Sequence, residues 1–232
     1  MTREQLAAAG FPVAAAAYAR LAHFVELLLR ENRVVNLTAI REPDDIWRLH
    51  VCESLALGPL IEQSHPRTLL DLGTGGGLPG IPLACVYDDL EITLLDATRK
   101  KLLACERMVT ELGLRRVGLI WGRAEVLAHE EGLREVFDVV TARGVAPLPT
   151  LIEYAAGFIR PGGWAWFAKP TASEGDITRA DSAARQCGLE HTGTRPLVIP
   201  GDTRRSILIY HKRRALRHDL PRANGLPRRR PL

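Results

Sequence analysis

Apolar and polar positions along the chain follow two different periods, and the change falls near residue 65. Upstream, apolar side chains recur at helical spacing, so we predict helices at 14–30 and 44–63, joined by a turn and a short extended piece at 32–40. Downstream, short apolar runs alternate with helical patterns. There we predict strands at 69–72, 91–96, 117–121, 136–142, 164–169, 191–199 and 205–211, and helices at 79–87, 98–112, 124–129, 149–159 and 173–187.

This alternation predicts a parallel, doubly wound α/β sheet with right-handed crossovers. A turn at Pro161, Gly162 and Gly163 should precede the fifth strand. Only residues 200–202 separate the last two strands, so we predict a hairpin whose last strand enters the sheet antiparallel. Seven strands with a terminal hairpin are the order of class I methyltransferases, which use S-adenosylmethionine (SAM). A dinucleotide dehydrogenase does not need that hairpin.

The length of 232 residues suits one α/β domain with an appendage. We expect an N-terminal helical cap at 1–64, a cofactor-binding core at 65–212 and a C-terminal tail at 213–232. No apolar run reaches the roughly 18 residues that span a membrane, and the N-terminus lacks a signal-peptide pattern. The four cysteines lie far apart without a C-x-x-C pair. We therefore expect reduced core thiols, no metal site and a cytoplasmic protein. The sequence gives no sign of an oligomer, so a monomer is the default expectation.

The net charge of +4 hides an asymmetry between the tail and the rest of the chain. Residues 212–232 hold eight Lys or Arg and one Asp, so the 211 residues before them carry a net charge of −3. Pro221, Pro227 and Pro231 make the tail unsuited to regular structure. Two interpretations stay open: an arm that binds phosphates, or a solvated tail that aids solubility.

The most informative segment is 69–84, LLDLGTGGGLPGIPLA, whose pattern is typical of a strand, a glycine loop and a helix. Its glycines let the backbone turn sharply and approach a ligand, and Pro79 suits the first position of a helix. Such a loop at a helix N-terminus binds a nucleotide-like cofactor. Asp71 lies inside the apolar strand and requires a partner, because an unpaired buried charge is costly.

The loop satisfies two cofactor fingerprints at once. One is the G-x-G-x-x-G of dinucleotide enzymes, matched by residues 75–80, with Asp96 at the spacing of a ribose-binding acid. The other is the D-x-G-x-G of SAM methyltransferases, matched by Asp71, Gly73 and Gly75. The loop alone leaves the choice open, and the terminal hairpin favours SAM.

In an open α/β sheet the ligand lies outside the carboxyl ends of the strands, so residues at those ends are the candidates. Asp96 ends the second strand and suits the ribose hydroxyls. Residues 122–125 follow the third strand on the adenine side, and Arg143 follows the fourth, facing the transferred methyl group. Thr98 is equally suited to cap the next helix, and Glu125 to be a first-turn acid favoured by the helix dipole.

Several motifs together carry a resemblance that runs nearly end to end. They are NLTAI followed by His50 and Glu53-Ser54-Leu55, DLGTGGGLPGIPLA, LLDATRKK, GRAE, TARGVAPLP and the C-terminal PRANGLPRRRPL. In this order they resemble the RsmG family (glucose-inhibited division protein B), the bacterial 16S ribosomal RNA guanine-N7 methyltransferases. The resemblance implies SAM-dependent methylation of guanosine 527 in a loop of 16S rRNA. It implies as partner that RNA, the small ribosomal subunit or its assembly intermediate.

The resemblance also implies roles for individual residues. The SAM site would comprise Gly73 and Leu78 of the loop, Asp96, Ala97 and Thr98 on the ribose side, and Ala124 and Glu125 at the adenine, besides Asp71 and Gly75 of the fingerprint. Arg143 lies at the reaction centre and also beside the cofactor, and Lys169 and Arg205 complete the candidate catalytic set. Glu53 stands where the family has Asp, and neither Pro170 nor Ser206 is the family's residue. These departures concern the RNA-facing side more than the SAM site.

Guanine N7 carries a free lone pair, so its methylation needs no general base, and no Ser-His-Asp or Cys-His arrangement demands one. We predict that Arg143, Lys169 or Arg205 contacts guanine O6 or a phosphate and leaves N7 bare. A SAM enzyme for a small molecule, a nicotinamide oxidoreductase and a non-catalytic RNA-binding module are the alternatives.

Two further polar features need a place in the fold. His50 lies three positions before Glu53, on one helix face. We predict that this pair ties the cap to the core; the alternative is a place in the substrate cleft. The tryptophans are predicted to pack in the core, with Trp47 as the candidate for stacking on RNA bases.

Overall fold

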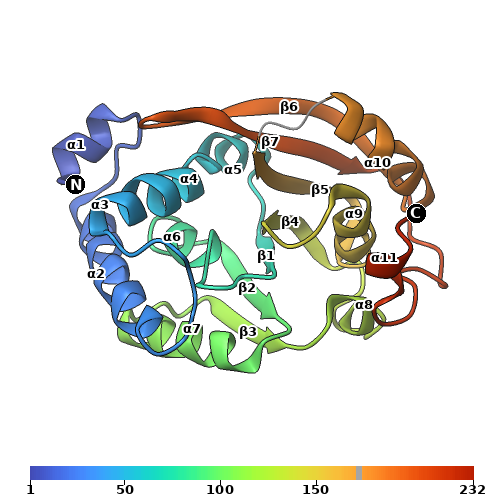
Figure 1. Cartoon of the computed structure of the whole chain (residues 1–232), viewed down its shortest axis with the longest axis horizontal. Helices are drawn as coiled ribbons and strands as arrows, with labels where there is room; N and C mark the ends of the chain where they lie inside the picture. Colours follow the sequence, from blue (N-terminus) through green and yellow to red (C-terminus); the bar gives the residue numbers. More distant parts are fainter. Residues whose placement is uncertain (171–173) are drawn as a thin grey trace.

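In the computed structural model, which describes residues 1–170 and 174–232, seven strands form one sheet in the order β3-β2-β1-β4-β5-β7-β6 (Figure 1). The strands are β1 Thr68–Leu72, β2 Glu91–Asp96, β3 Val117–Trp121, β4 Phe137–Arg143, β5 Ile159–Pro170, β6 Leu189–Ile199 and β7 Asp202–Lys212. Strands β1 to β5 pair in parallel, and β7 lies antiparallel between β5 and β6. This is the predicted class I methyltransferase order. The terminal hairpin is confirmed, since Ile199 pairs with Asp202 across a two-residue turn whose Gly201 has a φ of +75°.

Helices cover both faces of the sheet (Figure 1). The cap holds α1 Arg3–Ala8, α2 Ala15–Asn32, α3 Pro43–Ile46, α4 Cys52–Leu55 and α5 Gly58–Ser64, and it shares one face with α6 Gly80–Ala84 and α7 Arg99–Glu111. The opposite face carries α8 Ala124–Leu127, α9 Leu148–Ala156, α10 Glu174–Gln186 and α11 Leu226–Arg229. Adjacent strand residues alternate between the two cores: Leu69 packs with the cap, and Leu70 packs toward α9.

Local differences from the predicted elements have identifiable causes. The single helix predicted at 44–63 is divided by a π-helical stretch, Trp47–Val51, and by a break before Gly58, where Pro59 opens the next helix. Pro161, Gly162 and Gly163 do not form a turn before the strand. They form a bulge inside β5, whose pairing jumps from Ile159 to Trp164 while β4 advances by only two residues.

The C-terminal tail packs against α9 and the residues around it (Figure 1, right). Leu216 and Leu220 are buried in the core cluster that includes α9. Regular structure was not expected, yet Leu226–Arg229 is helical, because Pro227 lies in the first turn, where its missing N–H costs nothing. This packing is inconsistent with a fully solvated tail.

The four cysteines are buried and unpaired, as predicted. Over the described ranges, no helix is both long and apolar enough for a membrane span. The same residues hold no cluster of His, Cys, Asp and Glu arranged to bind a metal ion.

Candidate functional site

The glycine loop is anchored from below by Asp71. This fully buried carboxylate accepts hydrogen bonds on Oδ2 from Thr74 Oγ1 at 2.6 Å and from the Gly80 N–H at 2.9 Å. Burial raises the pKa of Asp71 to about 6, against these two hydrogen bonds, which lower it. The predicted partner of Asp71 is thus the loop itself. Asp71 lies beneath the loop and shapes it, whereas the cavity is lined by other residues.

Gly73 brings the loop backbone close to the segment that follows β4. Its φ is +70°, and a Cβ built there would lie 2.6 Å from Val145 Cγ2, so no side chain fits. Gly75, with a φ of +58°, donates its N–H to Asp96 Oδ2 at 2.9 Å. The left-handed backbone therefore favours glycine at both positions, and at Gly73 the lack of space excludes a side chain as well.

A cavity opens beside this loop, outside the carboxyl ends of β1, β2, β3 and β4. Its lining residues are Leu72, Gly73, Leu95, Ala97, Gly122, Arg123, Ala124, Glu125, Val145, Ala146, Tyr154 and Arg228. Of the predicted SAM residues, Gly73, Ala97, Ala124 and Glu125 line it directly. The Leu78 side chain is buried in the core beneath the loop instead. This is the position where open α/β sheets bind ligands.

Asp96, the predicted ribose-side residue, joins the glycine loop to the start of α7. While Oδ2 accepts from Gly75, Oδ1 accepts the Thr98 N–H at 2.7 Å. Thr98 takes the N-cap position of α7, but its side chain makes no capping hydrogen bond within the described chain. Glu125 lies in the first turn of α8, as the helix-dipole interpretation expects, and it also lines the cavity.

The two predicted catalytic arginines meet on a carboxylate of the cap. Glu53, only 4% exposed, accepts hydrogen bonds from Arg143 Nη1 at 3.1 Å and from Arg205 Nη1 at 3.0 Å. Arg143 also donates to the Leu49 carbonyl. Glu53 thus joins the cap to the ends of β4 and β7. The third predicted residue, Lys169, donates its Nζ to the Ala146 carbonyl at 2.6 Å, and burial lowers its pKa.

His50 bonds within the cap rather than to Glu53. Its Nδ1 lies 3.0 Å from the Leu49 carbonyl, which can only accept, so Nδ1 carries the proton. Nε2 therefore accepts the Thr38 hydroxyl at 2.7 Å. Burial, together with the nearby charge of Arg143, lowers the pKa of His50 to about 3. The predicted tie between cap and core is thus made by Glu53, and His50 is a neutral residue that orders the cap.

The prediction for the tryptophans was wrong at two positions. Trp47 is 5% exposed and stacks on Tyr18 at 5.6 Å between ring centroids, so it packs in the cap. Trp121, the last residue of β3, is 57% exposed. Its Nε1 donates to the Ala97 carbonyl at 3.2 Å, and the Arg99 guanidinium lies 5.4 Å from the ring centroid. The sequence locates the end of the strand at Trp121, but it does not show whether another element covers the side chain. The exposure of Trp121 therefore could not be predicted.

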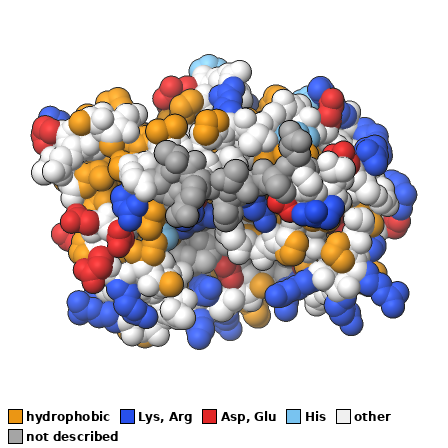
Figure 2. Space-filling model, turned by 45° about the horizontal axis from the view of Figure 1, so that its top comes forward, with side chains coloured by type: hydrophobic (Ala, Val, Ile, Leu, Met, Phe, Trp, Pro, Cys, Tyr) orange, Lys and Arg blue, Asp and Glu red, His pale blue; other side chains and the backbone are white. Residues whose placement is uncertain are grey.

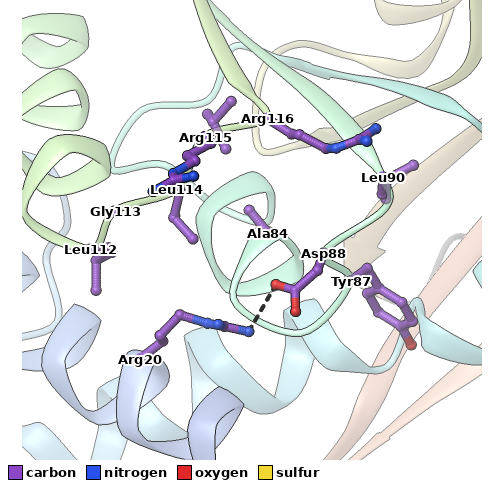
Figure 3. A pocket seen from close by; sticks show the side chains of 11 residues that line it. Arg20, Ala84, Tyr87, Asp88, Leu90, Leu112, Gly113, Leu114, Arg115 and Arg116 are labelled. Atoms are coloured by element: carbon purple, nitrogen blue, oxygen red, sulfur yellow. Dashed lines mark hydrogen bonds and ion pairs between the residues drawn. The ribbon is translucent and has the colours of Figure 1, made fainter.

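A second hollow lies at the opposite edge of the sheet, where β2 and β3 begin (Figure 3). Three arginines line it, Arg20, Arg115 and Arg116. The Arg20 guanidinium is held by the Cys85 carbonyl and by Asp88 at 2.9 Å, which joins α2 to the end of α6. Ligands of open α/β sheets bind at the carboxyl ends, so the cavity beside the glycine loop is the candidate site.

Comparison with known proteins agrees with this geometry. The family model described as "GidB: rRNA small subunit methyltransferase G" matches residues 17–204. The "Ribosomal RNA small subunit methyltransferase G" of Moorella thermoacetica is 37% identical over 90% of this chain and 88% of its own. The protein with the same description from Chloroflexus aggregans is 36% identical over 99% of this chain and 96% of its own.

Solved structures show the same fold at lower identity. The O-methyltransferase from Bacillus cereus in complex with SAH superposes with a TM-score of 0.60 at 20% identity, covering 90% of this chain and 96% of its own. A putative O-methyltransferase from Klebsiella pneumoniae gives a TM-score of 0.57 at 15% identity, over 91% and 96%. These likenesses concern the fold.

Proposed function

Since the chain belongs to the rRNA small subunit methyltransferase G family, we propose that it methylates N7 of one guanine in 16S ribosomal RNA, guanosine 527, and acts as a monomer. The enzyme is a SAM-dependent rRNA methyltransferase. The finer assignment of atom and position rests on the resemblance described above. The arrangement of the site supports it.

The cavity beside the glycine loop fits the adenosyl part of SAM. Gly73 lets the loop backbone pass close to Val145 at the cavity wall, the Asp96 carboxylate lies at the proposed ribose side, and Ala124 and Glu125 line the proposed adenine side. When bound, SAM supplies a methyl group on a positively charged sulfonium. The chain would provide the cavity that holds the cofactor and an orientation for the acceptor base.

The charges around the reaction centre suit an acceptor that needs no deprotonation. His50 is neutral, with both ring nitrogens engaged, and Arg143 and Arg205 both pair with Glu53. An arginine on N7 would block the lone pair and oppose the positive charge that develops on the base. Arg143 is held at the end of β4, so we propose that it meets guanine O6 or a phosphate. Alignment of the two reactants then supplies catalysis, worth roughly 7–11 kcal/mol.

The acceptor base must leave an RNA helix to reach the site. N7 lies in the major groove, which is deep and narrow in A-form RNA, so the target guanine belongs in a loop or is flipped out. Lys and Arg side chains gather along the lower edge and the right of the face shown in Figure 2. Such a distribution suits phosphate contacts around a splayed loop and predicts salt-sensitive RNA binding.

The observation that carries this proposal is the cavity beside the glycine loop, outside the carboxyl ends of β1 to β4, together with the Glu53–Arg143–Arg205 cluster that joins the cap to β4 and β7. The test is transfer of label from radioactive SAM to small subunits or 16S rRNA from cells that lack the enzyme. Wild-type protein should label the RNA, and the Gly73→Ala variant should not. Label on a small molecule but never on RNA would favour the alternative of a small-molecule SAM enzyme.

A further inference from the structure

The C-terminal tail is fixed to α9 by buried polar contacts. Glu153, which is fully buried, accepts the Arg222 side chain on both carboxylate oxygens, at 2.9 Å and 2.7 Å, and also the Arg222 backbone N–H at 2.8 Å. Further along the tail, Thr150 donates its hydroxyl to the Pro227 carbonyl at 3.0 Å. A bidentate pair with a buried carboxylate is strong and directional, so the tail has a defined position.

The same tail reaches the wall of the cofactor cavity. Gly225 donates its N–H to Glu125 Oε1 at 2.9 Å, and Glu125 is only 3% exposed. Glu125 is also one of the cavity residues on the adenine side. One carboxylate therefore joins the tail to the place where adenine is proposed to bind, across 100 positions of sequence.

Arg228 is the tail's own contribution to that wall. It lines the cavity together with Glu125 and with Tyr154 of α9, and the Arg228 charge lies close enough to lower the Tyr154 pKa against the dominant effect of burial. Arg228 and the neighbouring Arg230 are both exposed, but only Arg228 is among the cavity residues. Sequence position alone does not distinguish the two arginines, whereas the fold does.

We propose that the C-terminal tail forms one wall of the SAM site and that Arg228 is a cofactor-binding residue, its guanidinium packing against the adenine. This rests on the proposed function in that the ligand is SAM. A planar guanidinium stacks on an aromatic face more effectively than an ammonium does. In this proposal the tail contributes to cofactor binding. The alternative is that the tail binds RNA phosphates, and the experiment below distinguishes the two.

The direct test is calorimetric binding of S-adenosylhomocysteine, the product form of SAM, to the purified protein without RNA. Arg228→Ala should bind it about five- to tenfold more weakly, as for loss of a partly desolvated cation–π contact. Arg230→Ala removes the same charge two positions away and should bind as wild type does. If Arg228→Ala also binds as tightly as wild type, and only its RNA affinity falls, the assignment to the cofactor is overturned.

The end of the cofactor that Arg228 meets can be assigned with 5′-methylthioadenosine, which keeps the adenosine and lacks the amino-acid part. Arg228→Ala should weaken both ligands by the same factor. Weaker binding of S-adenosylhomocysteine alone would place Arg228 at the amino-acid carboxylate and contradict the proposal. Failure of wild-type protein to bind either ligand would instead contradict the SAM assignment itself, so the two failures are distinguishable.

A shortened chain tests the wall as a whole. Ending the chain at Asn224 keeps the Arg222 pair with Glu153 and removes the partners of Glu125 and Thr150. This variant should bind S-adenosylhomocysteine more weakly than Arg228→Ala, because Glu125 also loses its hydrogen bond. In the full chain, bound S-adenosylhomocysteine should slow trypsin cleavage after Arg228. Unchanged cleavage would show that the tail docks independently of the cofactor, against the proposal.

Discussion

The carboxylate of Glu53 accepts a hydrogen bond from the Arg143 guanidinium at 3.1 Å, across 90 positions of sequence. Arg143 ends a core strand and Glu53 belongs to the cap, so one contact joins the two parts at the proposed reaction centre. Arg205 shares the same carboxylate. The cap thus does more than cover the sheet, since it sets the position of two of the three candidate catalytic residues.

Glu53→Ala should therefore impair both catalysis and folding. It leaves two arginine side chains, 18% and 30% exposed, without their carboxylate. We expect a loss of more than tenfold in kcat/KM and of about 3 kcal/mol in the free energy of unfolding, measured by urea denaturation. Glu53→Asp keeps the negative charge and introduces the residue that the family has at this position, so this variant should retain most activity.

The matched control removes an exposed carboxylate that also pairs with an arginine. Asp219 bonds Arg217, with side chains 65% and 55% exposed, so Asp219→Ala should cost under about 1 kcal/mol and leave the rate unchanged. Equal effects of the two substitutions would mean that Glu53 has no special place in the site.

Gly73→Ala should abolish binding of S-adenosylhomocysteine, because the new Cβ would lie 2.6 Å from Val145 Cγ2 at a φ of +70°. Adding Val145→Ala removes both γ-methyl groups, leaves the nearest contact at 3.5 Å and should restore part of the affinity. Gly113→Ala, at a φ of +65° with open space around it, carries the same backbone strain and should bind normally. Calorimetry of the four proteins separates the clash from the strain.

The sheet could be predicted because its signals are local. The strand at 91–96 and the one at 117–121 match the observed bounds, and the terminal hairpin followed from the short connection at Gly201. What the sequence could not reveal is which distant groups meet. The contact of Glu125 with Gly225 spans 100 positions. The exposure of Trp121 likewise depends on how elements distant in the sequence pack around it. The same limit applies to Asp71, whose hydrogen bonds to Thr74 and Gly80 beneath the loop could not be read from the sequence.

The pKa of His50 predicts a specific dependence of stability on pH. The folded-state pKa of about 3 lies below the ordinary value of 6.5, so below pH 6.5 the unfolded chain binds a proton that the folded chain does not. The contribution of His50 to the free energy of unfolding is fully present above pH 6.5. Below that pH it falls by up to about 1.4 kcal/mol per pH unit. Asp71, with its pKa raised to about 6 from 3.8, opposes this trend between pH 4 and 6, because the folded chain then holds the extra proton.

The His50 contribution is isolated by comparison with His50→Gln, which cannot titrate. The difference in free energy of unfolding between wild type and this variant should shrink between pH 6.5 and 5.5. An NMR titration should find the His50 ring neutral throughout that range. A ring that titrates near pH 6.5 would contradict the hydrogen-bonding scheme with Thr38.

Trp121 should report on the cofactor cavity. Its Nε1 donates to the Ala97 carbonyl, and Ala97 lines the cavity, so a bound adenosyl group changes its surroundings. We expect S-adenosylhomocysteine to change the tryptophan emission of wild-type protein and to leave that of Trp121→Phe nearly unchanged. A full response in Trp121→Phe would assign the signal to another tryptophan.

Methylation of guanosine 527 at N7 is best tested by a chemical map of the methyl group on 16S rRNA from cells lacking the enzyme, after treatment with purified protein and SAM. N7-methylation weakens the glycosidic bond of guanosine, so borohydride and aniline cleave the strand at the modified residue. We expect one new cleavage, at guanosine 527, and no new cleavage with the Gly73→Ala protein. Methyl transfer without aniline cleavage, or cleavage at a different guanosine, would contradict it.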